Sequence, residues 1–328
     1  AKTGDRYEEI TARLSEETAE KVSALGIPGV FLAREGWRFY PGEARAAHAL
    51  GFVGSDGAEL VGRYGLERYY EDVLRREPSS PYRNFFAELV GAARHIREGS
   101  EGDVQTSIEP AVQSFVERAL QTIAKRFAAR ETGAVVMSPQ TGEVLALAAT
   151  PSFNPNYFQK ETDWRMFVNP LVENVYEFGS IMKPLTVAAG IDAGAVSPTT
   201  TYDDKGFLEL DGKTFYNFDK KGRGLVPMQE VLSQSLNTGA AFVALTMGTE
   251  RFAEYVRAFG IGTETGIDLP NEASGLIDNL KSPRQIEYAT ASFGQGIATT
   301  PIAMTRALAS LANGGFLPNP HLATRISY

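Results

Sequence analysis

The chain has 328 residues, of which 43% are hydrophobic, with a net charge of −8 and an isoelectric point near 5.2. This composition is ordinary for a globular protein of one or two domains, and the acidic balance argues against nucleic acid as a partner because no basic field would attract phosphates. The absence of cysteine excludes thiol chemistry, and the three isolated histidines have no metal-ligand spacing, so we expect no metal and no cofactor.

The first hundred residues alternate between helical and extended patterns. Apolar residues at helical spacing predict a helix over residues 5–25, which Gly26 and Pro28 end. Residues 30–40 have a strand-like pattern that Pro41 and Gly42 turn, and residues 66–75 have a helical one. No apolar run reaches about 18 residues, so we expect no membrane span in the chain as given. Both of its ends resemble cuts within a longer protein.

Irregular composition over residues 76–102 predicts a boundary between a first domain, residues 1–100, and a second, residues 101–328. The second domain is predicted to open with a strand over residues 103–108 and a long helix that begins at Pro110 and runs to Ala129. Two apolar runs, residues 133–137 and 144–149, are separated by turn residues and predict a hairpin. Together these elements indicate an α+β fold in which helices flank an antiparallel sheet.

A candidate nucleophile and base lie in one short segment, where Gly179, Ser180 and Lys183 precede an apolar helical run. Pro184 is compatible only with the first turn of that helix, which places Ser180 and Lys183 on one face, because residues i and i+3 are neighbours. A serine needs an adjacent base to act as a nucleophile, and a desolvated lysine at the positive end of a helix dipole is one. Alone this spacing is a weak signal.

A second polar cluster, Ser235-Leu236-Asn237, is predicted to be a loop before a helix over residues 240–247. In an extended loop the hydroxyl and the carboxamide would point the same way, the first able to relay a proton and the second able to bind a peptide amide. The alternative is that these residues only cap the following helix.

Taken together, the S-x-x-K and S-x-N motifs resemble those of penicillin-binding transpeptidases. The resemblance to the monofunctional class B members implies a transpeptidase domain of the serine β-lactamase-like fold after a partial pedestal domain. It implies that Ser180, Lys183, Ser235 and Asn237 are catalytic and that Gly179, Gln295 and Gly296 contact substrate. Matching stretches are residues 38–41, 62–67, 103–113, 142–146, 151–155, 293–297, 300–301 and 312–315.

Three departures from the family pattern stand out. The third motif, K-T-G on a late strand, is absent from its place, and the tripeptide Lys2-Thr3-Gly4 spells it at the other end of the chain, where chance or circular permutation would explain it. Phe178 stands where the family usually has proline, and the membrane anchor and first part of the pedestal are missing. Because the missing strand supplies an oxyanion-hole N–H, we expect the longer protein to be active and this segment to be inactive.

The resemblance implies a peptidoglycan D,D-transpeptidase that works through a Ser180 acyl-enzyme, and residues 150–328 are closer to the division type than to the elongation type. Its expected partners are stem peptides, β-lactams as inhibitors, a glycosyltransferase and other wall-synthesis proteins. Its expected location is the bacterial membrane, with the catalytic domain outside the cytoplasm. Two alternatives stay open: a hydrolase such as a D,D-carboxypeptidase or β-lactamase, and a non-catalytic scaffold.

Overall fold

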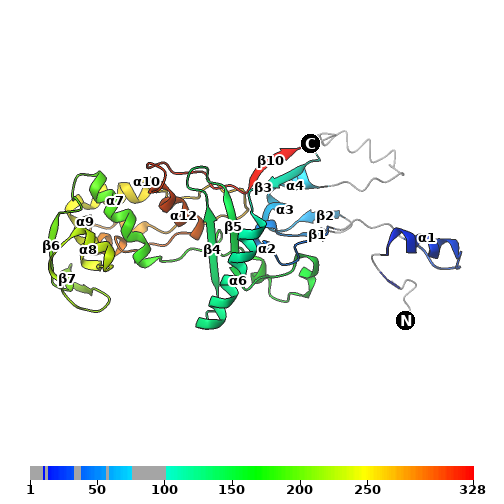
Figure 1. Cartoon of the computed structure of the whole chain (residues 1–328), viewed down its shortest axis with the longest axis horizontal. Coiled ribbons are helices and arrows are strands. Elements are labelled where there is room, and N and C mark those ends of the chain that lie inside the picture. The colour runs from blue at the N-terminus through cyan, green and yellow to red at the C-terminus, as the bar shows by residue number, and fades with distance from the viewer. Residues whose placement is uncertain (1–9, 12–13, 33–37, 57–58, 76–100) are drawn as a thin grey trace.

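The computed structural model describes residues 10–11, 14–32, 38–56, 59–75 and 101–328 (Figure 1). The elements before residue 76 are α1 (Glu16–Ala24), α2 (Ala47–Leu50), β1 (Val53–Asp56), β2 (Glu59–Gly62), α3 (Gly65–Tyr69) and α4 (Glu71–Leu74). In Figure 1 helix α1 stands apart from the rest, whereas α2, α3 and the β1–β2 hairpin lie against the larger second part.

The second part begins with β3 (Asp103–Thr106), α6 (Pro110–Phe127), β4 (Thr132–Met137), β5 (Val144–Thr150), η1 (Pro155–Lys160), η2 (Trp164–Phe167), η3 (Gly179–Met182) and α7 (Lys183–Asp192). It continues with β6 (Thr201–Asp204), β7 (Phe207–Leu210), β8 (Lys213–Tyr216), β9 (Gly224–Pro227), α8 (Met228–Ser233), α9 (Asn237–Met247) and α10 (Thr249–Ala258). It ends with η4 (Asp278–Lys281), α11 (Gln285–Ala291), α12 (Pro301–Ser310) and β10 (Ala323–Ser327). Every strand pair in the described residues is antiparallel.

The predicted hairpin and the long helix before it are confirmed. Strands β4 and β5 pair with Ala134 opposite Ala148, and α6 packs against them. Gln113, which is fully buried on α6, donates its amide to the carbonyl of Leu147 and accepts from the N–H of the same residue. These two bonds satisfy the buried amide and fix the helix on the strand.

A largely helical region carries the apolar core beside the candidate site. Helix α9 is apolar on nearly all sides, as expected of a helix enclosed by others, and α7, α10 and α11 pack against it. The core around α9 includes Met182, the last residue of η3, and Leu185 in the first turn of α7, together with Ala244, Phe252 and Tyr288. The beginning of α7 is therefore held by a packed core on one side.

Aromatic side chains join the first part to the second. Phe52 stacks on Phe158 and meets Phe153 edge-on, and Tyr40 is buried in the same cluster. His48 lies beside it, and burial lowers the pKa of His48 to about 4. This histidine is therefore neutral and structural.

Three predicted elements differ from the structure. The first helix begins at Glu16 because Ser15 caps it, its Oγ accepting from the N–H of Thr18. The strand predicted over residues 30–40 is absent from the residues described there, since both backbone groups of Tyr40 bond to the Asn156 side chain. The helix predicted over residues 66–75 breaks at Tyr70, whose hydroxyl donates to Asp268.

The proposed domain boundary falls at residues 76–102, most of which lie outside the described residues, so the division at residue 100 stays a prediction. None of the helices in the described ranges is both long and apolar enough to cross a membrane.

Candidate active site

The serine and lysine of the first motif lie at the start of one helix, as predicted. Gly179 has a φ of +59°, a left-handed conformation that glycine adopts without steric penalty. It begins the 3-10 turn η3, which carries Ser180 and leads into α7 at Lys183, with Pro184 in the first turn. Ser180 is exposed to solvent, whereas Lys183 is only 2% exposed.

Lys183 holds its amine between two hydroxyls and a carbonyl. Its Nζ lies 3.0 Å from the Oγ of Ser180, 2.9 Å from the Oγ of Ser235 and 2.6 Å from the backbone oxygen of Ser235. Burial lowers the pKa of Lys183 to about 8, because desolvation disfavours the ammonium form. Among the described residues no carboxylate pairs with this amine to oppose that shift.

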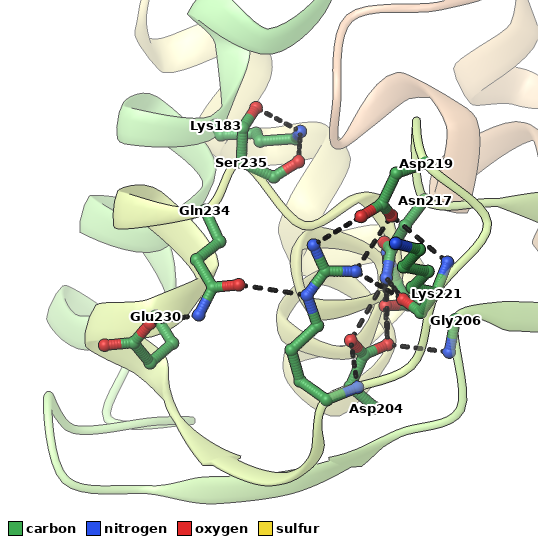
Figure 2. Close-up of polar contacts among 11 residues, drawn as sticks. Lys183, Asp204, Gly206, Asn217, Asp219, Lys221, Glu230, Gln234 and Ser235 are labelled. Carbon is green, nitrogen blue, oxygen red and sulfur yellow. Dashed lines mark hydrogen bonds and ion pairs between the residues drawn. The ribbon is translucent and has the colours of Figure 1, made fainter.

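Ser235 occupies the left-handed position that ends helix α8, where glycine is the usual residue. Its φ is +55°, its N–H bonds to the carbonyl of Leu232, and the N–H of Leu236 bonds to the carbonyl of Val231. These two bonds are the pair that defines a Schellman turn. The turn aims both the carbonyl and the Oγ of Ser235 at Lys183 (Figure 2).

The expected geometry of the second motif was therefore wrong in detail. Ser235 is not extended, and Asn237 is the first residue of α9 rather than part of a loop that runs to residue 239. The Asn237 Nδ2 donates to the carbonyl of Tyr216 at 2.9 Å, which ties the motif to strand β8. No side chain caps α9 at Leu236, so the N-cap alternative does not describe this turn.

A buried carboxylate behind the second motif was missed by sequence reasoning. Asp204 is 1% exposed and accepts hydrogen bonds from Asn217 Nδ2 and the backbone N–H of Gly206 (Figure 2). It also accepts from Thr238 Oγ1 and the backbone N–H of Arg223. Asn217 in turn accepts from the N–H of Thr238. The network joins strand β6 and the residue before β9 to the first turn of α9, and these segments lie too far apart in the sequence to be linked by a motif.

A cleft of about 440 Å³ opens between these segments. Gly179, Ser180, Ser235, Asn237 and Gln295 all line it, so the structure brings together five of the seven residues expected at the site. The remaining walls are Asn217, Phe218, Asp219, Arg223, Gln234, Leu236 and Phe293.

Two expected residues lie beside the cleft rather than on its lining. Lys183 is buried beneath it and reaches it through the two hydroxyls. Gly296 is not among the lining residues, and its N–H and carbonyl bond to the side chains of Glu177 and Asn279. The tripeptide Lys2-Thr3-Gly4 lies outside the described residues.

The arrangement suits nucleophilic chemistry. An exposed hydroxyl within hydrogen-bond distance of a desolvated amine is the geometry of an activated serine, with a second hydroxyl on the same amine as a proton carrier. In the part of the chain that the structure describes, no group of three or more His, Cys, Asp or Glu side chains has the geometry to hold a metal ion.

Comparison with known proteins agrees with chemistry that uses a serine nucleophile. Residues 132–328 match the penicillin binding protein transpeptidase domain. Stage V sporulation protein D of Bacillus subtilis is 33% identical over 95% of this chain and 48% of its own length. Peptidoglycan D,D-transpeptidase MrdA of Acinetobacter baumannii is 30% identical over 98% of this chain and 53% of its own length. The chain thus spans about half the length of these relatives.

Solved structures agree with the fold prediction. Penicillin binding protein 3 of Mycobacterium tuberculosis, without ligand and in complex with aztreonam, matches 88% of this chain with a TM-score of 0.76 and 27% identity. In each case the match covers 61% of that protein's chain. The predicted α+β penicillin-binding transpeptidase fold is confirmed. The chain belongs to the transpeptidase family of class B penicillin-binding proteins.

Proposed function

We propose that this chain carries the catalytic centre of a peptidoglycan D,D-transpeptidase with Ser180 as the nucleophile. The observation that supports it most is one buried amine, that of Lys183, in contact with the hydroxyls of Ser180 and Ser235 at the base of a cleft. The names of the relatives, which include peptidoglycan D,D-transpeptidases, support the substrate class.

In the proposed reaction, Ser180 Oγ attacks the carbonyl of the penultimate D-alanine of a stem peptide while Lys183 Nζ takes the hydroxyl proton. The C–N bond then breaks, and the leaving D-alanine amine receives a proton through Ser235 Oγ, which lies 2.9 Å from Lys183 Nζ. An amine of a neighbouring stem peptide attacks the acyl-enzyme, gives up its proton by the same route and releases Ser180. A pKa near 8 leaves about a tenth of the Lys183 amines neutral at pH 7 and able to act as the base.

The other expected residues have supporting roles. Asn237 lines the cleft two residues after Ser235, so its side-chain oxygen is placed to accept from a substrate amide while its Nδ2 bonds to Tyr216. Gly179 and Gln295 form cleft wall near Ser180 and would contact the acyl group. Gly296 acts indirectly, because its backbone contacts with Glu177 and Asn279 hold the neighbouring Gln295 in place.

β-Lactams should acylate Ser180 as substrate mimics, a proposal supported by the M. tuberculosis neighbours solved with aztreonam and with ampicillin. We also propose that the enzyme works outside the cytoplasm at the bacterial membrane with a glycosyltransferase partner. The division type stays a prediction.

The first test is acylation of the full-length protein by a labelled β-lactam, with the modified residue located by mass spectrometry. We expect one adduct on Ser180 and none in Ser180→Ala. An adduct on a different residue, or none at all in the wild-type protein, would reject the assignment.

A second test identifies the acceptor, by incubating the protein with a pentapeptide donor and a D-amino acid or peptide amine. Exchanged or cross-linked product supports the transpeptidase. Hydrolysis alone indicates a carboxypeptidase or β-lactamase, and no Ser180-dependent product indicates a scaffold.

A further inference from the structure

Arg223 bridges two walls of the cleft. Its Nη1 and Nη2 each lie 2.8 Å from one carboxylate oxygen of Asp219, and its Nε donates to Gln234 Oε1 at 2.9 Å. Its own backbone N–H bonds to the buried carboxylate of Asp204. The guanidinium therefore connects the segment that precedes β9 to the end of helix α8.

Gln234, the residue to which the Arg223 Nε donates at the end of α8, is adjacent to Ser235. Gln234 is the C-cap residue of α8, and Ser235 follows it in the left-handed conformation that side-chain-bearing residues disfavour. Such a conformation persists only where the surroundings hold it. The Gln234 side chain is held from both directions, by Arg223 and by Glu230.

We propose that Arg223 is a positioning residue for acylation: by fixing Gln234 it holds the turn that directs the carbonyl and Oγ of Ser235 onto Lys183. This inference rests on the proposed function. Rotation of the turn would move both of these oxygens together, because they belong to one residue that contacts the amine at 2.6 and 2.9 Å. Lys183 would keep only its contact with Ser180.

The contacts of Arg223 favour positioning over direct binding of substrate. Of the five N–H donors of a guanidinium, one on Nε, two on Nη1 and one on Nη2 are used by Gln234, Asp219 and the carbonyl of Lys221. Asp219 also neutralises the charge that an anionic group of the substrate would seek. Lysine has no planar fork and cannot make these contacts at once, so Arg223→Lys is an informative variant.

The test separates the dissociation constant of a labelled β-lactam from its first-order acylation rate at Ser180 in the full-length protein. We expect Arg223→Ala, Arg223→Lys and Gln234→Ala each to lower the acylation rate by about tenfold, less than the ~100-fold that a 1 Å misplacement can cost, with the dissociation constant changed less than about twofold. Arg223→Ala combined with Gln234→Ala should be no slower than either single variant, because both act through one contact.

The matched control is Arg165→Ala, which removes another Arg–Asp pair, with Nε 2.9 Å from Asp163, in the turn η2 and not on the cleft lining. It should leave both constants unchanged. If the Arg223 variants raise the dissociation constant and leave the acylation rate unchanged, the inference is overturned and Arg223 is a binding residue. It would also be overturned if the fold-reduction of the acylation rate in the double variant equalled the product of the two single-variant reductions. An unlabelled wild-type Ser180 would reject the proposed function itself, and this inference with it.

Discussion

Two turns meet at the Lys183 amine, one at the start of α7 and one at the end of α8. Both contain a left-handed residue, Gly179 with φ +59° and Ser235 with φ +55°. The first turn uses glycine, which adopts this conformation freely, and places the functional hydroxyl on the next residue. The second turn uses serine, so the strained residue is also the one that supplies the contacts. Strain at Ser235 therefore cannot be relieved by mutation without loss of a functional group.

The two turns also differ in how closely they are packed. A Cβ added at Gly179 would meet no atom within 4 Å, so only its backbone conformation restricts the residue there. A Cβ at Gly294, in contrast, would lie 2.3 Å from the carbonyl oxygen of Gly179. The first turn thus packs against a second glycine, while the second turn receives polar contacts from Arg223, which bonds to Gln234, and from Lys183, which bonds to Ser235.

The largest difference between the two turns should appear when Ser235 is substituted. Ser235→Ala and Ser235→Gly both remove the Oγ, and we expect each to slow acylation at Ser180 by about 100-fold, the lower end of the range for general acid–base groups. Only the glycine variant relieves the left-handed strain. Its free energy of unfolding should therefore exceed that of the alanine variant by about 1 kcal/mol.

Acylation rates and urea unfolding of the two Ser235 variants test both statements. Equal stabilities would show that the turn carries no strain. Near wild-type acylation in either variant would remove Ser235 from the proposed proton path.

The pH dependence of acylation tests the shared amine. Because burial lowers the pKa of Lys183 to about 8 and the neutral amine is the base, the rate should fall about tenfold for each unit below pH 8. Above pH 8 it should level off, since the amine is then mostly neutral. Stopped-flow measurement of the acylation rate between roughly pH 5.5 and 9.5, on both sides of the lowered pKa, tests this dependence. A rate that stays flat across pH 8 would exclude Lys183 as the titrating base.

The smallest expected effect concerns the glycine turn. Gly179→Ala should destabilise the protein by about 1 kcal/mol, because alanine disfavours a positive φ, and should slow acylation a few-fold, since Ser180 is the next residue. Gly194→Ala is the matched control: Gly194 follows α7 with φ +68° and equally open space around a new Cβ. It should lose similar stability and keep its acylation rate. Slower acylation in Gly194→Ala would show that the effect reports stability alone.

The first turn could be predicted from the sequence and the second could not, for a physical reason. Gly179 signals a left-handed position, and Pro184 is restricted to a first helical turn, so local chemistry fixes where Ser180 and Lys183 lie. Ser235 takes the position of a glycine against its own preference. Nothing local reveals this, because the backbone bonds of the turn require no particular residue type and its side-chain contacts come from afar. Lys183 lies 52 residues before Ser235, and Arg223 lies 11 residues before Gln234.

The same contrast runs through the fold. The β4–β5 hairpin and helix α6 follow from local periodicity and turn residues. The Asp204 network and the path of the chain at Tyr40 depend on side-chain contacts across 34 and 116 residues, which a pattern along one sequence does not contain. Single polar side chains that bond to partners distant in the sequence are the points where prediction failed.

The three contacts of Lys183 also restrict what the amine can do once it loses a proton. An ammonium has three N–H groups for its three partners, but a neutral amine has two N–H groups and one lone pair. The carbonyl of Ser235 can only accept, so it always occupies one N–H. The lone pair must then face a hydroxyl, either that of Ser180 or that of Ser235. The Ser235 carbonyl, which has no proton to give, therefore limits the neutral amine to two proton donors. These are the attacking hydroxyl of Ser180 and the proton-carrying hydroxyl of Ser235.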